Sequence, residues 1–121
     1  MHNTNCARPV GGYGTILEDA GQFAPADMVN AHPHHILFKV GNGSAQQALV
    51  AKGQGYLNAV GIDPILGVEN LTWAPNVAGQ HTLKTLTPLV DDLRMANQLG
   101  ASREQVAQIL ADHGAAAARR R

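Results

Sequence analysis

Histidines gather in one short stretch of this chain, and they are the residues best suited to chemistry. His32, His34 and His35 fall within four positions, and an apolar run from Ile36 to Phe38 follows directly. Imidazole is the commonest side-chain metal ligand, and in its unperturbed state it is the only side chain that titrates near neutral pH. The stretch therefore predicts a site for metal binding, proton transfer or both. The alternative is a surface cluster without a role.

The apolar run predicts a strand with the paired histidines at its end. Neighbouring residues of a strand point to opposite faces, so one imidazole of the pair can bind a metal while the other moves protons. Asn70 lies in a second extended segment, 69–75, and His81 lies near the start of a helix expected over about 78–99. A ββα unit, with two strands and a helix, would bring these positions to one point.

In such a unit, one imidazole from the first strand and His81 hold a divalent cation. The other histidine of the pair takes a proton from water. Asn70 carries an amide that both donates and accepts hydrogen bonds, so it either orients that imidazole or pins the hairpin. A helix N-terminus beside the cation would favour an approaching phosphate.

The remaining patterns predict helices around this unit. Ser44 is a good N-cap for a helix that ends before Gly61. Ser102 and Gln105 form a capping box for a last helix through His113, with 114–121 as a frayed tail. Pro88 either kinks the long helix or restarts it. The expected fold class is α+β and mostly helical, a small ββα core with flanking helices.

Domain organisation follows from the distribution of glycine and proline. Residues 1–27 are rich in both and predict a linker-like lead-in, with a possible short strand at 14–18 and a terminal His2 without a ligand role. Residues 28–121 have the length of a single small domain. We therefore expect one functional unit, preceded by the remnant of a linker to a larger polypeptide.

Composition excludes several classes of protein. Lys+Arg and Asp+Glu number 9 each, which argues against nucleic-acid binding through charge alone, although a bound cation can supply a local positive field. Cys6 is the only cysteine, so an intrachain disulfide and a cysteine-based zinc site are ruled out. No run approaches the roughly 20 apolar residues of a membrane span, and no signal peptide is visible.

Several motifs occur together and in order, and as a set they resemble one family. The chain resembles the AHH branch of the HNH (His-Me finger) nucleases, which occur as C-terminal toxin domains of bacterial polymorphic toxins, including Rhs-repeat and contact-dependent inhibition effectors. The resemblance covers roughly Met28 to His113. The motifs are His34-His35-Ile36-Leu37, Gln46-Gln47 with Gly53-Gln54, Gly61-Ile62-Asp63-Pro64, Glu69-Asn70-Leu71 with Trp73-Ala74-Pro75, and Gly79-Gln80-His81.

The resemblance assigns a role to each polar residue. His34 matches the first metal-binding position, His35 the general base, Asn70 the central asparagine and His81 the second metal ligand. Pro33 stands where the name-giving pattern has alanine, which leaves His32 as a rival for the ligand role. The implied cofactor is a divalent ion: Mg²⁺, Mn²⁺, Ni²⁺ or Zn²⁺.

The same resemblance implies a biological setting. The activity would be a metal-dependent endonuclease that hydrolyses phosphodiester bonds, with DNA favoured over RNA. The domain would be delivered as part of a larger secreted effector into the cytoplasm of a competitor, and a cognate immunity protein would block it. Two other readings of the residues stay open: a noncatalytic binding module stabilised by histidine-bound zinc, and a helical interaction domain with incidental histidines.

Overall fold

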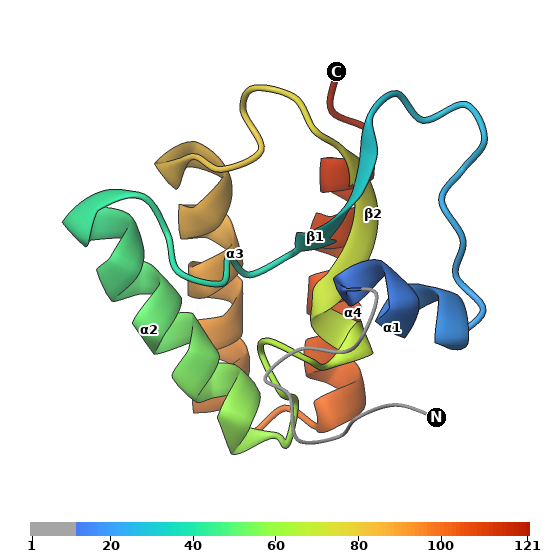
Figure 1. The fold of residues 1–121 in the computed structure, drawn as a ribbon. Helices are drawn as coiled ribbons and strands as arrows, with labels where there is room; N and C mark the ends of the chain where they lie inside the picture. Colours follow the sequence, from blue (N-terminus) through green and yellow to red (C-terminus); the bar gives the residue numbers. More distant parts are fainter. Residues whose placement is uncertain (1–11) are drawn as a thin grey trace.

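The computed structural model describes residues 12–121 and shows a mixed α+β fold that is mostly helical (Figure 1). His2 and Cys6 lie outside the described residues. None of the helices in residues 12–121 has the length and apolar character that a membrane crossing requires. The elements in chain order are α1 (Tyr13–Asp19), β1 (Ala31–His35), α2 (Gly43–Ala59), the 3-10 turn η1 (Val68–Asn70), β2 (Leu71–Pro75), α3 (Leu83–Gln98) and α4 (Arg103–Ala118).

The two strands form a small antiparallel sheet. Ala31 pairs with Pro75 at one end and His35 with Leu71 at the other. The apolar run 36–38 was expected to form the first strand, but β1 ends at His35 and the run follows it. The second strand begins one residue after Asn70, which belongs to the 3-10 turn. The two strands are not joined by a tight turn. Helix α2 and the loop after it form the connection between them.

The core lies between α2, α3 and α4 and includes the residues that follow β1, 36–38, called here the β1 segment. Helices α2 and α3 lie side by side, and α4 passes behind the sheet (Figure 1). Apolar residues in a helix meet one face every three or four positions, and the α3 residues Leu86, Leu89, Val90 and Leu93 are buried accordingly. The core cluster is Ile36, Leu37, Phe38, Val50, Leu57, Ile62, Leu86, Leu89, Val90, Leu93, Ala96, Val106 and Leu110.

Close helix packing at two glycines fixes how α2 and α4 lie on the β1 segment. A Cβ at Gly53 of α2 would lie 2.7 Å from Leu37 Cδ1, and one at Gly114 of α4 would lie 2.9 Å from Ile36 Cδ1. Both glycines are buried inside their helices. The missing side chains therefore let both helices approach the strand-end residues closely.

The N-terminal part of the described chain differs from its prediction. Residues 14–18 were expected to form a short strand, but they belong to helix α1, which packs against both strands. Leu17 is fully buried, and Trp73 Nε1 donates to the Gln22 carbonyl at 3.0 Å. A Cβ at Gly14 would lie 3.0 Å from the Trp73 ring. The segment after Gly12 is thus docked on the sheet, because the Trp73 ring gives α1 an apolar surface to cover.

Three helix boundaries were also wrong. Helix α2 begins at Gly43 after Asn42, so Ser44, the expected N-cap, lies within its first turn. Helix α3 begins at Leu83 rather than near Ala78, because Thr82 caps it by accepting from Thr85 N, and it runs through Pro88 without restarting. Helix α4 continues to Ala118, where a frayed tail from residue 114 was expected. The Ser102–Gln105 capping box is confirmed at its start. Burial of the small residues Gly114 and Ala117 holds the last turns in place.

Candidate functional site

The strand alternation of β1 sends His34 and His35 to different surroundings. His34 faces the helical core and is 3% exposed, and its Nδ1 is buried without a hydrogen-bond partner. His35 is half-buried and packs edge-on against Tyr13 of α1, with ring centroids 4.6 Å apart. An unpaired buried polar atom is uncommon in folded proteins and calls for a physical explanation. The Nδ1 atom of His34 is therefore the first sign of a ligand-binding role.

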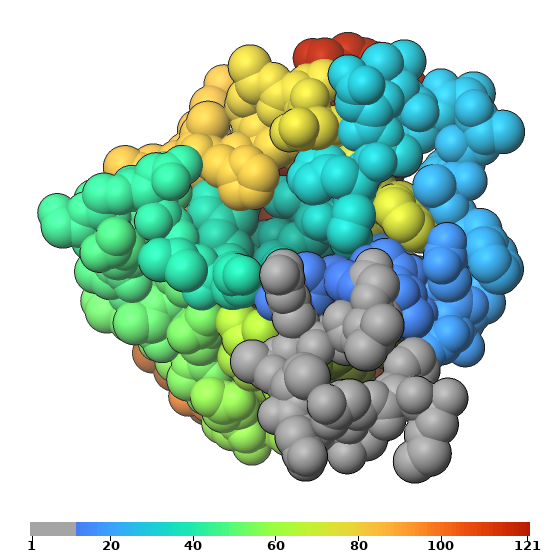
Figure 2. Space-filling view, viewed as in Figure 1, coloured from blue at the N-terminus to red at the C-terminus, as the bar shows by residue number. Residues whose placement is uncertain are grey.

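His81 lies beside His34, although 47 positions separate them in the sequence. The two ring centroids are 5.2 Å apart, and the Phe38 ring lies 5.1 Å from His81 and 6.3 Å from His34. Gln46 of α2 donates to the His81 carbonyl at 3.2 Å, which anchors the turn before α3. In the space-filling view, the teal residues that follow β1 border the golden residues at the start of α3 (Figure 2). The predicted meeting of the paired histidines with residue 81 thus involves His34.

His32 is also close to this pair. Its ring centroid lies 6.0 Å from that of His34, and its Nδ1 is 2.9 Å from the Ala74 carbonyl on β2. Because a carbonyl oxygen only accepts, Nδ1 of His32 carries the hydrogen and the lone pair of the neutral ring is on Nε2. His32 therefore remains a rival ligand with one nitrogen already committed to the sheet.

Burial and neighbouring positive charge keep His34 and His81 neutral. Burial, followed by the charges of His81, His32, Arg120 and His35, lowers the pKa of His34 to about 3. His81 is exposed as a whole, but desolvation of its packed ring, followed by the charge of His32, lowers its pKa as well. A metal ligand must be deprotonated, so both rings have lone pairs available at neutral pH.

The tautomer of His35 follows from its one polar contact. Nε2 lies 2.9 Å from the Ile65 carbonyl, so this nitrogen donates and the lone pair is on Nδ1. Burial lowers the pKa of His35, the Ile65 hydrogen bond opposes that shift, and the Lys39 charge adds to it. Lys39 Nζ lies 5.4 Å from the Tyr13 ring centroid, on the same side of the sheet. His35 is therefore an oriented imidazole whose lone pair lies on Nδ1 in the neutral form.

Asn70 is buried, and its side chain hydrogen-bonds both to the segment after β1 and to the loop before η1. Its Oδ1 accepts from Leu37 N at 2.7 Å, and its Nδ2 donates to the carbonyls of Leu37 at 3.0 Å and Pro64 at 2.8 Å. The Asn70 side chain is fully buried. The sequence left two roles open for Asn70: orienting an imidazole directly or holding the two strands together. These contacts are all with backbone atoms and favour the second role. Because Pro64 precedes Ile65, these hydrogen bonds also fix the carbonyl that orients His35.

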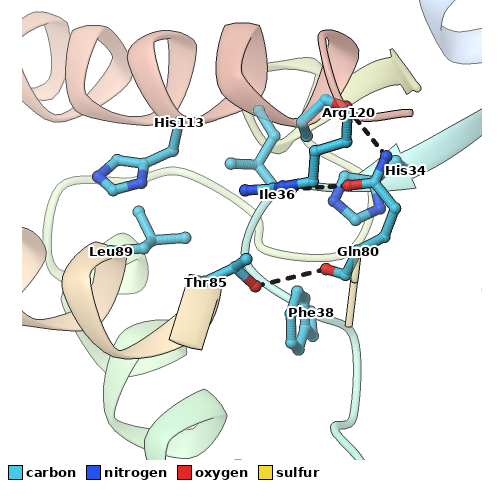
Figure 3. A pocket seen from close by; sticks show the side chains of 9 residues that line it. His34, Ile36, Phe38, Gln80, Thr85, Leu89, His113 and Arg120 are labelled. Atoms are coloured by element: carbon cyan, nitrogen blue, oxygen red, sulfur yellow. Dashed lines mark hydrogen bonds between the residues drawn. The ribbon is translucent and has the colours of Figure 1, made fainter. Parts of the chain in front are cut away.

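Sequence reasoning missed the contribution of α4 to this site. Gln80 is 1% exposed, and its Nε2 donates to the carbonyls of Pro75 and Ala117, both at 2.9 Å. Arg120 donates to Gln80 Oε1 at 2.6 Å (Figure 3). His34, Gln80 and Arg120 line one small cavity of about 10 Å³. The sequence left the three terminal arginines as either phosphate contacts or a solvated end, and the alanine-rich end of α4 gave no sign that Arg120 would lie beside His34.

The donor set can be tested against a divalent ion. No group of three or more His, Cys, Asp or Glu side chains within residues 12–121 has an arrangement that could hold a metal. The ring centroids of His34 and His81 are 5.2 Å apart, a separation that two imidazoles bound to one ion through bonds of about 2.1 Å can have. The Nδ1 atom of His34 is buried and has no hydrogen-bond partner within the described residues. Two imidazoles leave coordination positions free for substrate and water.

Comparisons with protein families, curated proteins and solved structures gave no match to this chain. The functional argument therefore rests on the residues and geometry described above.

Proposed function

We propose that this chain is a metal-dependent endonuclease of the His-Me finger type. The observation that carries the proposal is the contact between His34 at the end of β1 and His81 before α3, together with the unpartnered Nδ1 of His34. His34 and His81 are 47 positions apart in the sequence, so only the tertiary fold brings them into contact. It joins the residues that the motif pattern singles out as the two metal ligands.

The order of the elements supports the ββα part of the proposal. Strands β1 and β2 pair antiparallel, and α3 is the next helix after β2. We propose that these three elements form the nuclease core, with α1, α2 and α4 as flanking helices. Helix α2 is then an insertion between the two strands.

We assign the ligand role to His34 and His81, with Mg²⁺, Mn²⁺, Ni²⁺ or Zn²⁺ as the ion. When bound, such an ion acts as a Lewis acid that neutralises charge on the scissile phosphate and the leaving oxygen. His35 accepts a proton from water on Nδ1, while its Nε2–H stays with the Ile65 carbonyl. Asn70 acts through the backbone, by holding the strand end against the Pro64–Ile65 loop.

The biological part of the proposal depends on the family resemblance alone. The domain would act on nucleic acid, with DNA favoured, in the cytoplasm of a competing bacterium. It would reach that cell as part of a larger secreted effector, and a cognate immunity protein would protect the producer.

A plasmid-nicking assay on protein made in a cell-free system tests the enzymatic core of the proposal. Wild-type protein should nick plasmid when a divalent ion is added, and chelator should stop it. His35→Ala should lower the rate by roughly 10²- to 10⁴-fold, the usual contribution of a general base. Asn58→Ala is the control, since that side chain is exposed on α2, and it should cut at the wild-type rate.

Two results would count against the proposal. Equal cutting by wild type and His35→Ala would exclude His35 as the base. Unfolding by chelator with no cleavage under any ion would favour the noncatalytic zinc-stabilised module.

A further inference from the structure

We propose that Arg120 binds a phosphate of the nucleic-acid substrate, an assignment that deepens the proposed nuclease function and rests on it. Arg120 follows the last turn of α4 and is half-buried. It lines the same small cavity as the buried ligand candidate His34 (Figure 3). Helix α4 would thereby supply the positive charge that the neutral composition of the chain does not provide.

The guanidinium of Arg120 is held in place by a rigid partner. Gln80 is almost fully buried, and both hydrogens of its amide are used by the Pro75 and Ala117 carbonyls. Its Oε1 therefore points in a fixed direction, and Arg120 donates to it at 2.6 Å. Orienting a guanidinium in advance reduces the entropy lost when it binds an anion.

The charge of Arg120 is not cancelled within the described chain. The ion pairs recorded in residues 12–121 involve Arg94 with Asp91, Arg103 with Glu69 and His113 with Asp92, and none of them includes Arg120. Its contact with Gln80 is to a neutral oxygen and uses one of five guanidinium hydrogens. The remaining donors match the oxygens of a phosphodiester, which guanidinium binds in a bidentate manner.

Gln80, the partner of the Arg120 guanidinium, belongs to the turn before α3. Gln80 is the neighbour of His81 in the chain, and its backbone carbonyl accepts from Thr85 Oγ1 at 3.5 Å. The Gln80 side chain thus fixes Arg120 at the cavity that His34, our first metal ligand, also lines. A phosphate bound at His34 would lie near the Arg120 guanidinium, whose direction Gln80 sets.

Duplex binding without cleavage is the test, with chelator present throughout. The readout is the anisotropy of a dye-labelled DNA duplex at a series of salt concentrations. Arg120→Gln should weaken binding about tenfold at low salt and reduce the slope of log K against log salt by about 1. Arg119→Gln removes the same charge from the neighbouring exposed position, and it should change the affinity less than about threefold.

Arg120→Lys guards against a purely structural effect. It keeps the charge and a donor for Gln80, so it should melt as wild type does and keep the wild-type salt slope. A smaller slope for Arg120→Lys, equal weakening by Arg119→Gln and Arg120→Gln, or no duplex binding by wild type at low salt would each overturn the inference.

The outcomes also separate this inference from the proposed nuclease. Cleavage by wild type, with unchanged binding and cutting in Arg120→Gln, removes Arg120 from the site and leaves the nuclease standing. Binding that depends on Arg120, with no cleavage under any divalent ion, supports the phosphate contact and contradicts the enzyme.

Discussion

Burial sets the chemistry of His34. The ring is 3% exposed, and desolvation, followed by the positive charges around it, lowers its pKa to about 3. Burial disfavours the charged imidazolium, so His34 is neutral at neutral pH and keeps a lone pair. The same perturbation links the site to the stability of the fold.

The stability of the metal-free protein should fall as the pH drops from about 6.5 towards 3. The folded state binds the His34 proton less readily than the unfolded state does, so stability is complete above the ordinary pKa and is lost below it. One such group contributes a slope of at most about 1.4 kcal/mol per pH unit. His35 and His81 have pKa values lowered in the same direction and add to the slope.

Urea unfolding in chelator at several pH values measures that slope. His34→Asn removes the titrating group, so its slope between pH 6 and pH 4 should be shallower than that of wild type. Equal slopes in the two proteins would show that His34 is protonated in the folded state as easily as in the unfolded state.

Asn70 offers a second prediction at the same scale. Asn70→Ala should destabilise the fold by about 3 kcal/mol, because it leaves the buried Leu37 N–H and two carbonyls without their partner. Cutting should weaken while metal binding by His34 and His81 is largely kept. Chemical denaturation and metal titration check the two effects, with the exposed Asn58→Ala as control. Loss of metal binding would mean that Asn70 has a different role.

At the scale of the element, helix α2 contains two glycines with opposite surroundings. Gly53 faces the buried Leu37 side chain, whereas nothing lies within 4 Å of a Cβ at Gly55. Gly55→Ala should therefore stabilise the protein by about 0.5–1 kcal/mol through helix propensity. Gly53→Ala should destabilise it by about 1–3 kcal/mol through overpacking. Thermal melts of the two variants measure these opposite changes in Tm. Equal shifts in Tm would show that the Leu37 side chain can move to make room for the added methyl group.

The elements that the sequence predicted well are those with periodic apolar residues or local capping. Leu86, Val90 and Leu93 mark α3, and Ser102 with Gln105 marks the start of α4. Helix α1 and the end of α4 lack these signals. They are held by contacts distant in sequence, such as Trp73 with Gln22 and Gln80 with Ala117. Local propensity therefore could not reveal them.

The site was predictable to a similar extent and for a related reason. Residue type and order in the chain made the clustered histidines, Asn70 and His81 candidates, and the family resemblance assigned their separate roles. Which histidine faces which neighbour depends on the strand register, Ala31 with Pro75 and His35 with Leu71. That register follows from burial on both faces of a five-residue strand, which no single segment encodes.

At the scale of the whole molecule, the fold has an apolar core of its own. Thirteen buried apolar residues form one cluster across three helices and the β1 segment, so the fold has its own source of stability. Removing a bound ion should therefore abolish cleavage but leave the protein folded at 25 °C. The loss of stability should not exceed the binding term, about 2.7 kcal/mol for an ion at 100 times its Kd.

Circular dichroism melts with and without chelator check this expectation. A folded baseline in both, with a modest shift in Tm, agrees with an open two-histidine site. An unfolded spectrum at 25 °C in chelator would instead mean that the ion is structural.

Trp73 is the only tryptophan of the chain, and it lies where the N-terminal helix meets the sheet. Its indole N–H is bonded to Gln22, and its ring is covered at Gly14, so its emission wavelength depends on whether α1 is seated. Because α1 also supplies Tyr13 to the ring of His35, the intrinsic fluorescence of this protein reports directly on the integrity of one wall around that histidine.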